Sequence, residues 1–187
     1  MDPVLLPDSE ARCLLQPEFE LEFSAQVSPA QELIGAPPVP LTTAQLPVSP
    51  VIGDIALRFA PDLSSVEFRL NLFGVVNPAN LNEAITQAHL HAGRANENGP
   101  IIATLVRFAD LDEAGVQVNG LLAEGVLRNV DITPVSSPSG LAFNSIASLY
   151  NGIRAREVYV NVHGSSFDGL KPSFASGIAR GQIFPQA

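Results

Sequence analysis

Short segments in which apolar and polar residues alternate strictly constrain the fold of this chain more than any other feature. The clearest is residues 66–72, where Val, Phe, Leu and Leu are separated by Glu, Arg and Asn. Successive side chains of a β-strand point to opposite faces, so this period of two is typical of a strand with one buried face. The segment is therefore predicted to be a strand that packs its apolar face on a core.

Comparable segments recur along the chain, separated by Gly, Pro, Asn and Asp. Strands are predicted at residues 19–25, 55–59, 84–91, 101–108, 116–118, 126–130, 157–163 and 178–184. Residues 141–150 have apolar residues at helical spacing, with Gly152 placed to cap the C-terminus of a short helix. Many short strands between turns predict an all-β, antiparallel sandwich or barrel, with one short helix in a connection.

The length and the distribution of proline predict one domain with an arm. A chain of 187 residues fits a single domain, and nine of its 16 prolines lie in the first 50 residues. Proline interrupts both helices and central strands. We therefore expect an N-terminal arm at 1–18, one β-domain at 19–187, and a proline-rich connection at 30–50.

Composition excludes several classes of protein. There are 10 basic against 19 acidic residues, which argues against a nucleic-acid partner. No apolar run approaches the roughly 18 residues of a membrane span. The single cysteine, Cys13, rules out an internal disulfide framework, and neither a phosphate-binding loop nor a nucleophile elbow occurs. The N-terminus lacks the basic and apolar parts of a signal peptide, while the scarcity of Lys and Cys is compatible with an exported protein from which that peptide is absent.

The three histidines of the chain fall on two of the predicted strands. Alternation places His89 and His91 on one face of the strand at 84–91, and His163 on the polar face of the strand at 157–163. If these strands are neighbours, one polar surface carries every histidine. The other polar residues expected on that surface are Gln87, Tyr159, Asn161, Arg180 and Gln182.

A His-x-His pair on one strand with a third His from an adjacent strand is a workable ligand set for Cu²⁺ or Zn²⁺. Tyr159, Asn161 or Asp168 are candidates to orient the rings or to complete the coordination. The alternative, which the residues by themselves leave open, is that the histidines only bind one another, Tyr159 or the backbone through hydrogen bonds.

Three motifs resemble those of a known family. The segments A-H-L-H-A-G at 88–93 with N-G-P-I at 98–101, Y-V-N-V-H at 159–163, and Gly177 with R-G-Q-I at 180–183 are similar, in order and spacing, to the CHRD domain, named from chordin. The resemblance covers roughly residues 19–184. It departs at Gly164, where the family usually has Thr, at Ile178, where it has an acidic residue, and in a longer loop after His163.

The resemblance implies an immunoglobulin-like Greek-key sandwich similar to copper/zinc superoxide dismutase, usually in an exported protein. It supports a copper-type site at His89, His91 and His163, with zinc as the alternative ion. The first functional hypothesis is thus an extracytoplasmic domain, periplasmic or secreted, for copper storage, delivery or protection. The second is a metal-free adhesion, matrix or protein-interaction module, with a homodimer or another protein as partner. The third is a dismutase-like oxidoreductase in which Arg180 steers anions; the sequence favours binding over enzymatic turnover.

Overall fold

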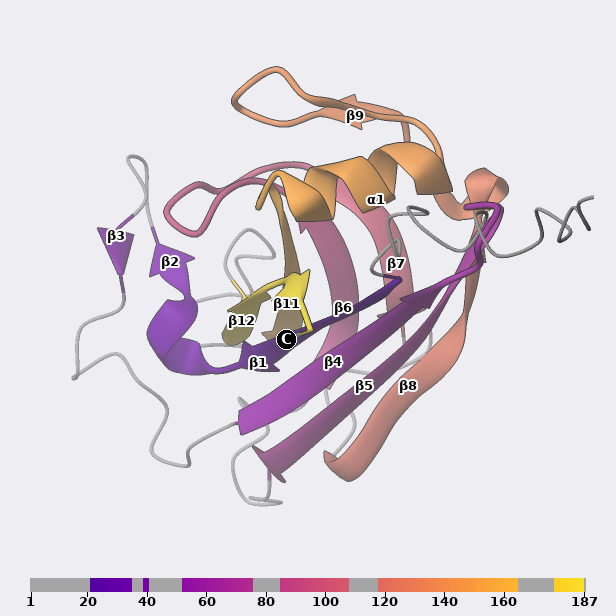
Figure 1. The fold of residues 1–187 in the computed structure, drawn as a ribbon. Helices are drawn as coiled ribbons and strands as arrows, with labels where there is room; N and C mark the ends of the chain where they lie inside the picture. Colours follow the sequence, from indigo (N-terminus) through magenta and orange to yellow (C-terminus); the bar gives the residue numbers. More distant parts are fainter. Residues whose placement is uncertain are drawn as a thin grey trace, which may run out of the picture.

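The alternating segments form two antiparallel β-sheets that pack face to face (Figure 1). The computed structural model describes residues 21–34, 39–40, 52–75, 85–107, 118–164 and 177–186. The first sheet contains, in spatial order, β13 (Phe184–Pro185), β1 (Glu22–Val27), β4 (Ile52–Phe59), β5 (Ser65–Val75) and β8 (Val118–Arg128). The second contains β12 (Ala179–Gln182), β11 (Val158–Gly164), β6 (Ile85–Ala92) and β7 (Ile101–Arg107). The predicted all-β sandwich is confirmed.

The smaller elements lie around these sheets. Two short ladders pair β2 (Leu33–Ile34) with β3 (Val39–Pro40), and β9 (Val135–Ser136) with β10 (Ala142–Phe143). Single 3₁₀ turns, η1 (Pro29–Gln31) and η4 (Asn129–Asp131), follow β1 and β8. The helix α1 (Ile146–Arg154) lies across one end of the sandwich (Figure 1).

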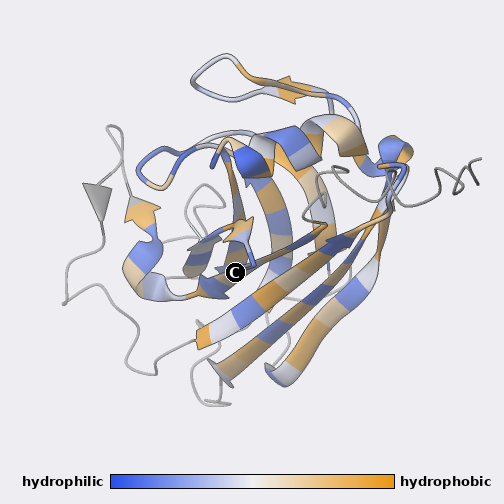
Figure 2. Cartoon of the chain, in the orientation of Figure 1, coloured by the Kyte–Doolittle hydropathy of each residue, from blue (hydrophilic) through white to orange (hydrophobic). Residues whose placement is uncertain are grey.

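Alternation determines which side chains enter the core. Along β5 the predicted apolar face is buried, with Val66, Leu70 and Leu72 at 0% exposure, while Glu67 and Arg69 between them are exposed. Figure 2 shows the resulting bands of hydrophobic and hydrophilic residues along β4 and β5. The two sheets bury these faces against each other, which supplies the main hydrophobic contribution to stability.

Two strand predictions were wrong in their limits. The segments predicted separately at 116–118 and 126–130 overlap the two ends of one strand, β8, which spans Val118–Arg128, and residues 129–130 belong to η4. This strand lies at the edge of its sheet and is paired to β5 along its length, so backbone hydrogen bonds form it where apolar alternation is weak. Conversely, the strand predicted at 178–184 divides into β12 and β13, which belong to different sheets.

The predicted helix at 141–150 was also placed too early. A capping box starts α1 at Ile146, because the Ser145 side chain accepts the N–H of Ser148 at 3.2 Å while the Ser148 hydroxyl accepts the N–H of Ser145 at 2.9 Å. The apolar residues at 142–143 instead form β10. Gly152 is not the C-cap: it lies inside the helix, where a Cβ would overlap the ring of Phe143.

The helix closes the core at its end of the sandwich. Its apolar face is buried, and Tyr150 meets Phe23 and Phe59 edge to face, with ring centroids 5.6 and 5.4 Å apart. The strands β6 and β11 have one apolar and one polar face. Their apolar residues enter the core between the sheets, and the residues between them line the other face of the four-stranded sheet.

The contact of Gly152 with Phe143 gives a test of the packing. We expect Gly152→Val to lower the free energy of unfolding by about 1–3 kcal/mol, because the added side chain overfills the core. Chemical denaturation measures this change. The matched control is Asn151→Ala, an exposed position one residue earlier in α1, which should stay within about 0.5 kcal/mol of the wild type. Equal stability of the two variants would contradict the packing.

Candidate metal centre

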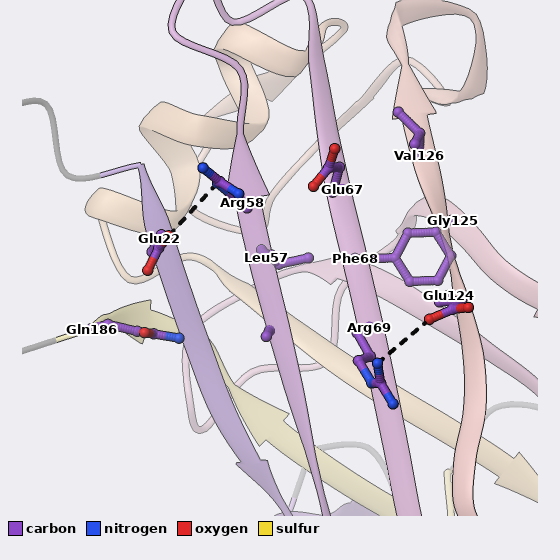
Figure 3. A pocket seen from close by; sticks show the side chains of 11 residues that line it. Glu22, Leu57, Arg58, Glu67, Phe68, Arg69, Glu124, Gly125, Val126 and Gln186 are labelled. Atoms are coloured by element: carbon purple, nitrogen blue, oxygen red, sulfur yellow. Dashed lines mark ion pairs between the residues drawn. The ribbon is translucent and has the colours of Figure 1, made fainter.

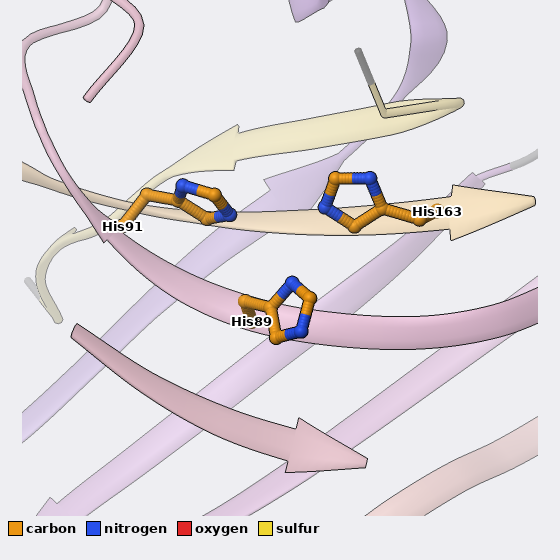
Figure 4. A group of neighbouring side chains, drawn as sticks. All are labelled: His89, His91 and His163. Carbon is orange, nitrogen blue, oxygen red and sulfur yellow. The ribbon is translucent and has the colours of Figure 1, made fainter. Parts of the chain in front are cut away.

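The pairing of β6 with β11 brings the three histidines onto one face. In this antiparallel pair Asn161 lies opposite His89, and His163 lies opposite Gln87. Directly opposed residues share a face, and His163 is therefore the diagonal neighbour of His89. Figure 4 shows the three imidazole rings gathered over these two strands. The predicted gathering of all three histidines on one polar face is thus observed.

Most irregularity in the sheet lies on the other side of β6, since the pairing of β6 with β11 shifts only between His163 and Gly164. The register of β6 with β7 shifts between Ala88 and His89 and again between Leu90 and His91, so β7 carries two extra residues. Such bulges let neighbouring residues face the same way, and both Ile102 and Ala103 are fully buried. The pairing of β6 with β11 stays regular through both histidines of β6.

The histidines form a close and buried cluster. The ring centroids of His89 and His163 are 5.1 Å apart, and those of His91 lie 5.7 and 5.9 Å from them. One ring nitrogen of each residue lies within 4.8 Å of the others. Their exposed fractions are 4%, 8% and 3%, for His89, His91 and His163 respectively. The expected polar surface is therefore a polar interior, partly because the turn at 93–100 lies over it and contacts His91.

Four ring nitrogens of the cluster are buried with no hydrogen-bond partner in the described part of the chain. They are His89 Nδ1, His91 Nε2 and both nitrogens of His163. Leaving a buried polar atom unpaired costs about 1–3 kcal/mol. Four unpaired nitrogens in one cluster therefore indicate that a ligand binds there. Imidazole nitrogens bind an ion such as Zn²⁺ at roughly 2.0–2.1 Å, and a set of three suits copper or zinc. The residues present therefore fit a metal ion.

Burial also keeps the rings in the protonation state that a metal requires. Desolvation lowers the pKa of His163 to about 3 and that of His91 to about 4, and the neighbouring histidines add to both effects. The pKa of His89 is lowered by burial and by the charge of Arg107. All three rings are neutral near pH 7, and a neutral imidazole is the form that coordinates a metal.

Tyr159 and Asn161 contact the cluster from β11. The Tyr159 ring stacks on His91, with centroids 5.0 Å apart and planes at 14°, and its hydroxyl accepts the N–H of Gly99 at 3.1 Å. Burial raises the pKa of Tyr159, so this hydroxyl stays protonated. Asn161 lies opposite His89, and its Oδ1 is buried without a partner among the described residues.

Arg180 shares this face but binds the turn at 93–100 instead of the histidines. The residue is 1% exposed. It donates to the carbonyl oxygens of Arg94 and Glu97 at 2.6 and 2.8 Å and to Asn98 Oδ1 at 3.0 Å. It also lies over the Tyr159 ring, 3.4 Å from the centroid. These contacts favour a structural role over the steering of anions from solvent.

The remaining predicted site residues are Gln182, Gln87 and Asp168, and they differ in their contacts. Gln182 donates through Nε2 to the carbonyl oxygen of Val158 at 2.9 Å, so it secures the start of β11. Gln87 is half-buried opposite His163 and stays near the cluster. Asp168 lies outside the described residues, as do Cys13 and the arm at 1–18.

Glu32 is a buried group that sequence reasoning missed. Its side chain is fully buried, Oε1 accepts the N–H of Leu33 at 3.1 Å, and Oε2 has no partner in the described residues. Desolvation raises the pKa of Glu32 to about 7, against the lowering effects of the Leu33 N–H and the charge of Arg180. No local signal marks it, because it belongs to the connection that follows β1.

The outer face of the five-stranded sheet has a different character. A hollow of ≈ 500 Å³ there is lined by charged side chains, with ion pairs of 3.7 Å between Glu22 and Arg58 and 3.8 Å between Arg69 and Glu124 (Figure 3). These pairs are exposed, and exposed pairs contribute little energy. Among the described residues, no unpaired buried side-chain atom lines this hollow.

Fold and site together define a class: an antiparallel β-sandwich with a buried three-histidine group on the outer face of its four-stranded sheet. The family model of the CHRD domain matches residues 23–171, which include all three histidines. The chain belongs to the CHRD domain family, whose members occur in extracellular proteins. The motif at 180–183 lies beyond the matched residues, and no curated protein matches the chain. No helix in the described residues is long and apolar enough to cross a membrane.

The lowered pKa values predict how the metal-free protein responds to acid. The unfolded chain takes up protons on histidine below pH ~6.5, while the folded cluster resists them, so the free energy of unfolding falls as the pH drops from ~6.5 toward 4. Each histidine that stays neutral contributes a loss of about 1.4 kcal/mol per pH unit. We expect His163→Gln to lose less stability over this range than the wild type. Urea denaturation with a chelator, at several pH values, measures the difference; parallel curves would contradict it.

Proposed function

We propose that this chain is an exported metal-binding domain that holds copper at His89, His91 and His163, with zinc as the alternative ion. The observation that carries the proposal is the group of buried ring nitrogens without partners, gathered from two strands. Histidines with a purely structural role normally pair both nitrogens with protein or water.

The donor set supports copper as the first choice. Three neutral imidazoles suit both ions, and a given nitrogen site generally binds Cu²⁺ more tightly than Zn²⁺. Burial of the cluster beneath the turn at 93–100 favours retention of an ion over rapid exchange with solvent. Copper storage, delivery or protection is the role that fits such a site. Because CHRD domains occur in extracellular proteins, we place this activity outside the cytoplasm.

Metal titration tests the site. We expect the wild type to bind one equivalent of Cu²⁺ by isothermal titration calorimetry, with nitrogen hyperfine structure in its electron paramagnetic resonance spectrum. The double variant His89→Ala with His163→Ala should bind at least about 100-fold more weakly, because one imidazole alone remains.

The control addresses adventitious binding to an acidic chain of net charge −9. Glu67→Gln with Glu124→Gln removes two carboxylates from the outer face of the other sheet and should leave Cu²⁺ affinity unchanged. Equal binding by the wild type and the histidine variant would refute the site. Failure to bind either Cu²⁺ or Zn²⁺ would favour the interaction-module hypothesis.

Metal binding should also stabilise the fold. A ligand present at 100 times its Kd that binds only the native state raises the free energy of unfolding by about 2.7 kcal/mol. We expect this increase on adding Cu²⁺ to the wild type and not on adding it to the double histidine variant. Chemical denaturation with and without the ion measures it, and elemental analysis of untagged protein identifies the ion acquired in the cell.

A further inference from the structure

The peptide of Gly99 is held at both of its polar ends by residues of the site. Its N–H donates to the Tyr159 hydroxyl at 3.1 Å, and its carbonyl oxygen lies 2.9 Å from His91 Nδ1. Since a carbonyl oxygen only accepts, the proton of the neutral His91 ring must be on Nδ1. The other nitrogen, Nε2, is then left with a free lone pair, and it is one of the buried atoms without a partner.

Only glycine fits at this position of the turn. A Cβ on residue 99 would overlap the carbonyl oxygen of Ala92 at the end of β6. The turn is drawn this close because the N–H of Ala92 donates to the carbonyl oxygen of Pro100 at 2.9 Å. The carbonyl of Gly99 therefore reaches the ring of His91, which immediately precedes Ala92 in β6.

Arg180 holds the rest of this turn in place. Three oxygens of the turn accept hydrogen bonds from its guanidinium, two from the backbone and one from the Asn98 side chain. Burying a guanidinium is costly unless its donors are satisfied, so the turn and Arg180 stabilise each other. The same guanidinium lies against the Tyr159 ring, whose hydroxyl orients the Gly99 peptide. Arg180 makes no hydrogen bond to a histidine and acts through these two partners.

We propose that Tyr159 and Arg180 are positioning residues that, through the Gly99 peptide, hold His91 in the tautomer that presents Nε2 to a metal ion. The part of this proposal that concerns the metal rests on the function proposed above, while the tautomer is a property of the metal-free protein. The network also explains why residues separated by 60 and 86 positions in the chain meet at one turn.

Nuclear magnetic resonance of metal-free, ¹⁵N-labelled protein tests the tautomer directly. Long-range ¹H–¹⁵N spectra distinguish Nδ1–H from Nε2–H rings, and the chain has only three histidines to assign. We expect wild-type His91 to be a single Nδ1–H tautomer. Tyr159→Phe removes the hydroxyl but keeps the ring, so His91 should become a mixture of tautomers, and affinity for Cu²⁺ alone should fall about 10–100-fold.

The matched control is Tyr150→Phe, which alters the only other tyrosine of the chain, in the cluster with Phe23 and Phe59. It should change neither the tautomer nor the affinity. Arg180→Lys keeps the charge but loses the fork that reaches three oxygens, and should shift His91 in the same direction as Tyr159→Phe. Because Arg180 is buried, a dispersed ¹⁵N spectrum must first show that the Arg180→Lys protein is folded. If Arg180→Lys unfolds, Tyr159→Phe alone decides the proposal.

Two results would overturn the proposal. One is a wild-type His91 that carries its proton on Nε2. The other is a folded Tyr159→Phe protein with unchanged tautomer and unchanged Cu²⁺ affinity. If the wild type binds no metal, the metal site is refuted, and the tautomer of His91 in the two tyrosine variants still decides whether Tyr159 positions it.

Discussion

The antiparallel pairing of β6 with β11 is the constraint on which the rest of the site depends. On one face of this pair, Ala, Leu and Val residues pack into the core between the sheets. On the other face lie all three histidines. A shift of one residue would turn the histidines into the core and the valines out of it, so the hydrophobic core enforces the register that assembles the cluster. Packing between the sheets thereby fixes the position of the histidines, which lie outside that core.

The polar face of this pair is buried, and some of its polar side-chain atoms have hydrogen-bond partners while others have none. Arg180 and Gln182 satisfy their donors on backbone oxygens of the turn and of the strand end. Four histidine ring nitrogens have no partner in the described residues, and the same holds for Asn161 Oδ1 and Gln182 Oε1, whereas His91 Nδ1 is paired with the Gly99 carbonyl oxygen. In a sheet buried on both faces, an unpaired nitrogen cannot rely on bulk water. The unpaired atoms of this face are therefore concentrated in the histidine group, which could hold a metal ion.

Sequence patterns predicted the fold where a single period dominates. The strand at 66–72 and the strands that carry the histidines were located correctly because alternation and burial coincide in them. The limits of β8 could not be predicted, because an edge strand is formed by its pairing with β5 more than by its own pattern. The start of α1 was missed because the Ser145–Ser148 capping box outweighs the apolar residues that precede it. Glu32 carried no pattern at all.

By itself the sequence determined the fold class, the family resemblance and the facing of His89, His91 and His163, because period-two alternation encodes facing locally. Only the tertiary structure decided that this face is buried, that Arg180 binds the turn at 93–100, and that the Gly99 carbonyl selects the proton position on His91. These features depend on contacts between segments far apart in the chain. No local pattern specifies them, because they arise only when the strand register and the path of the turn are both in place.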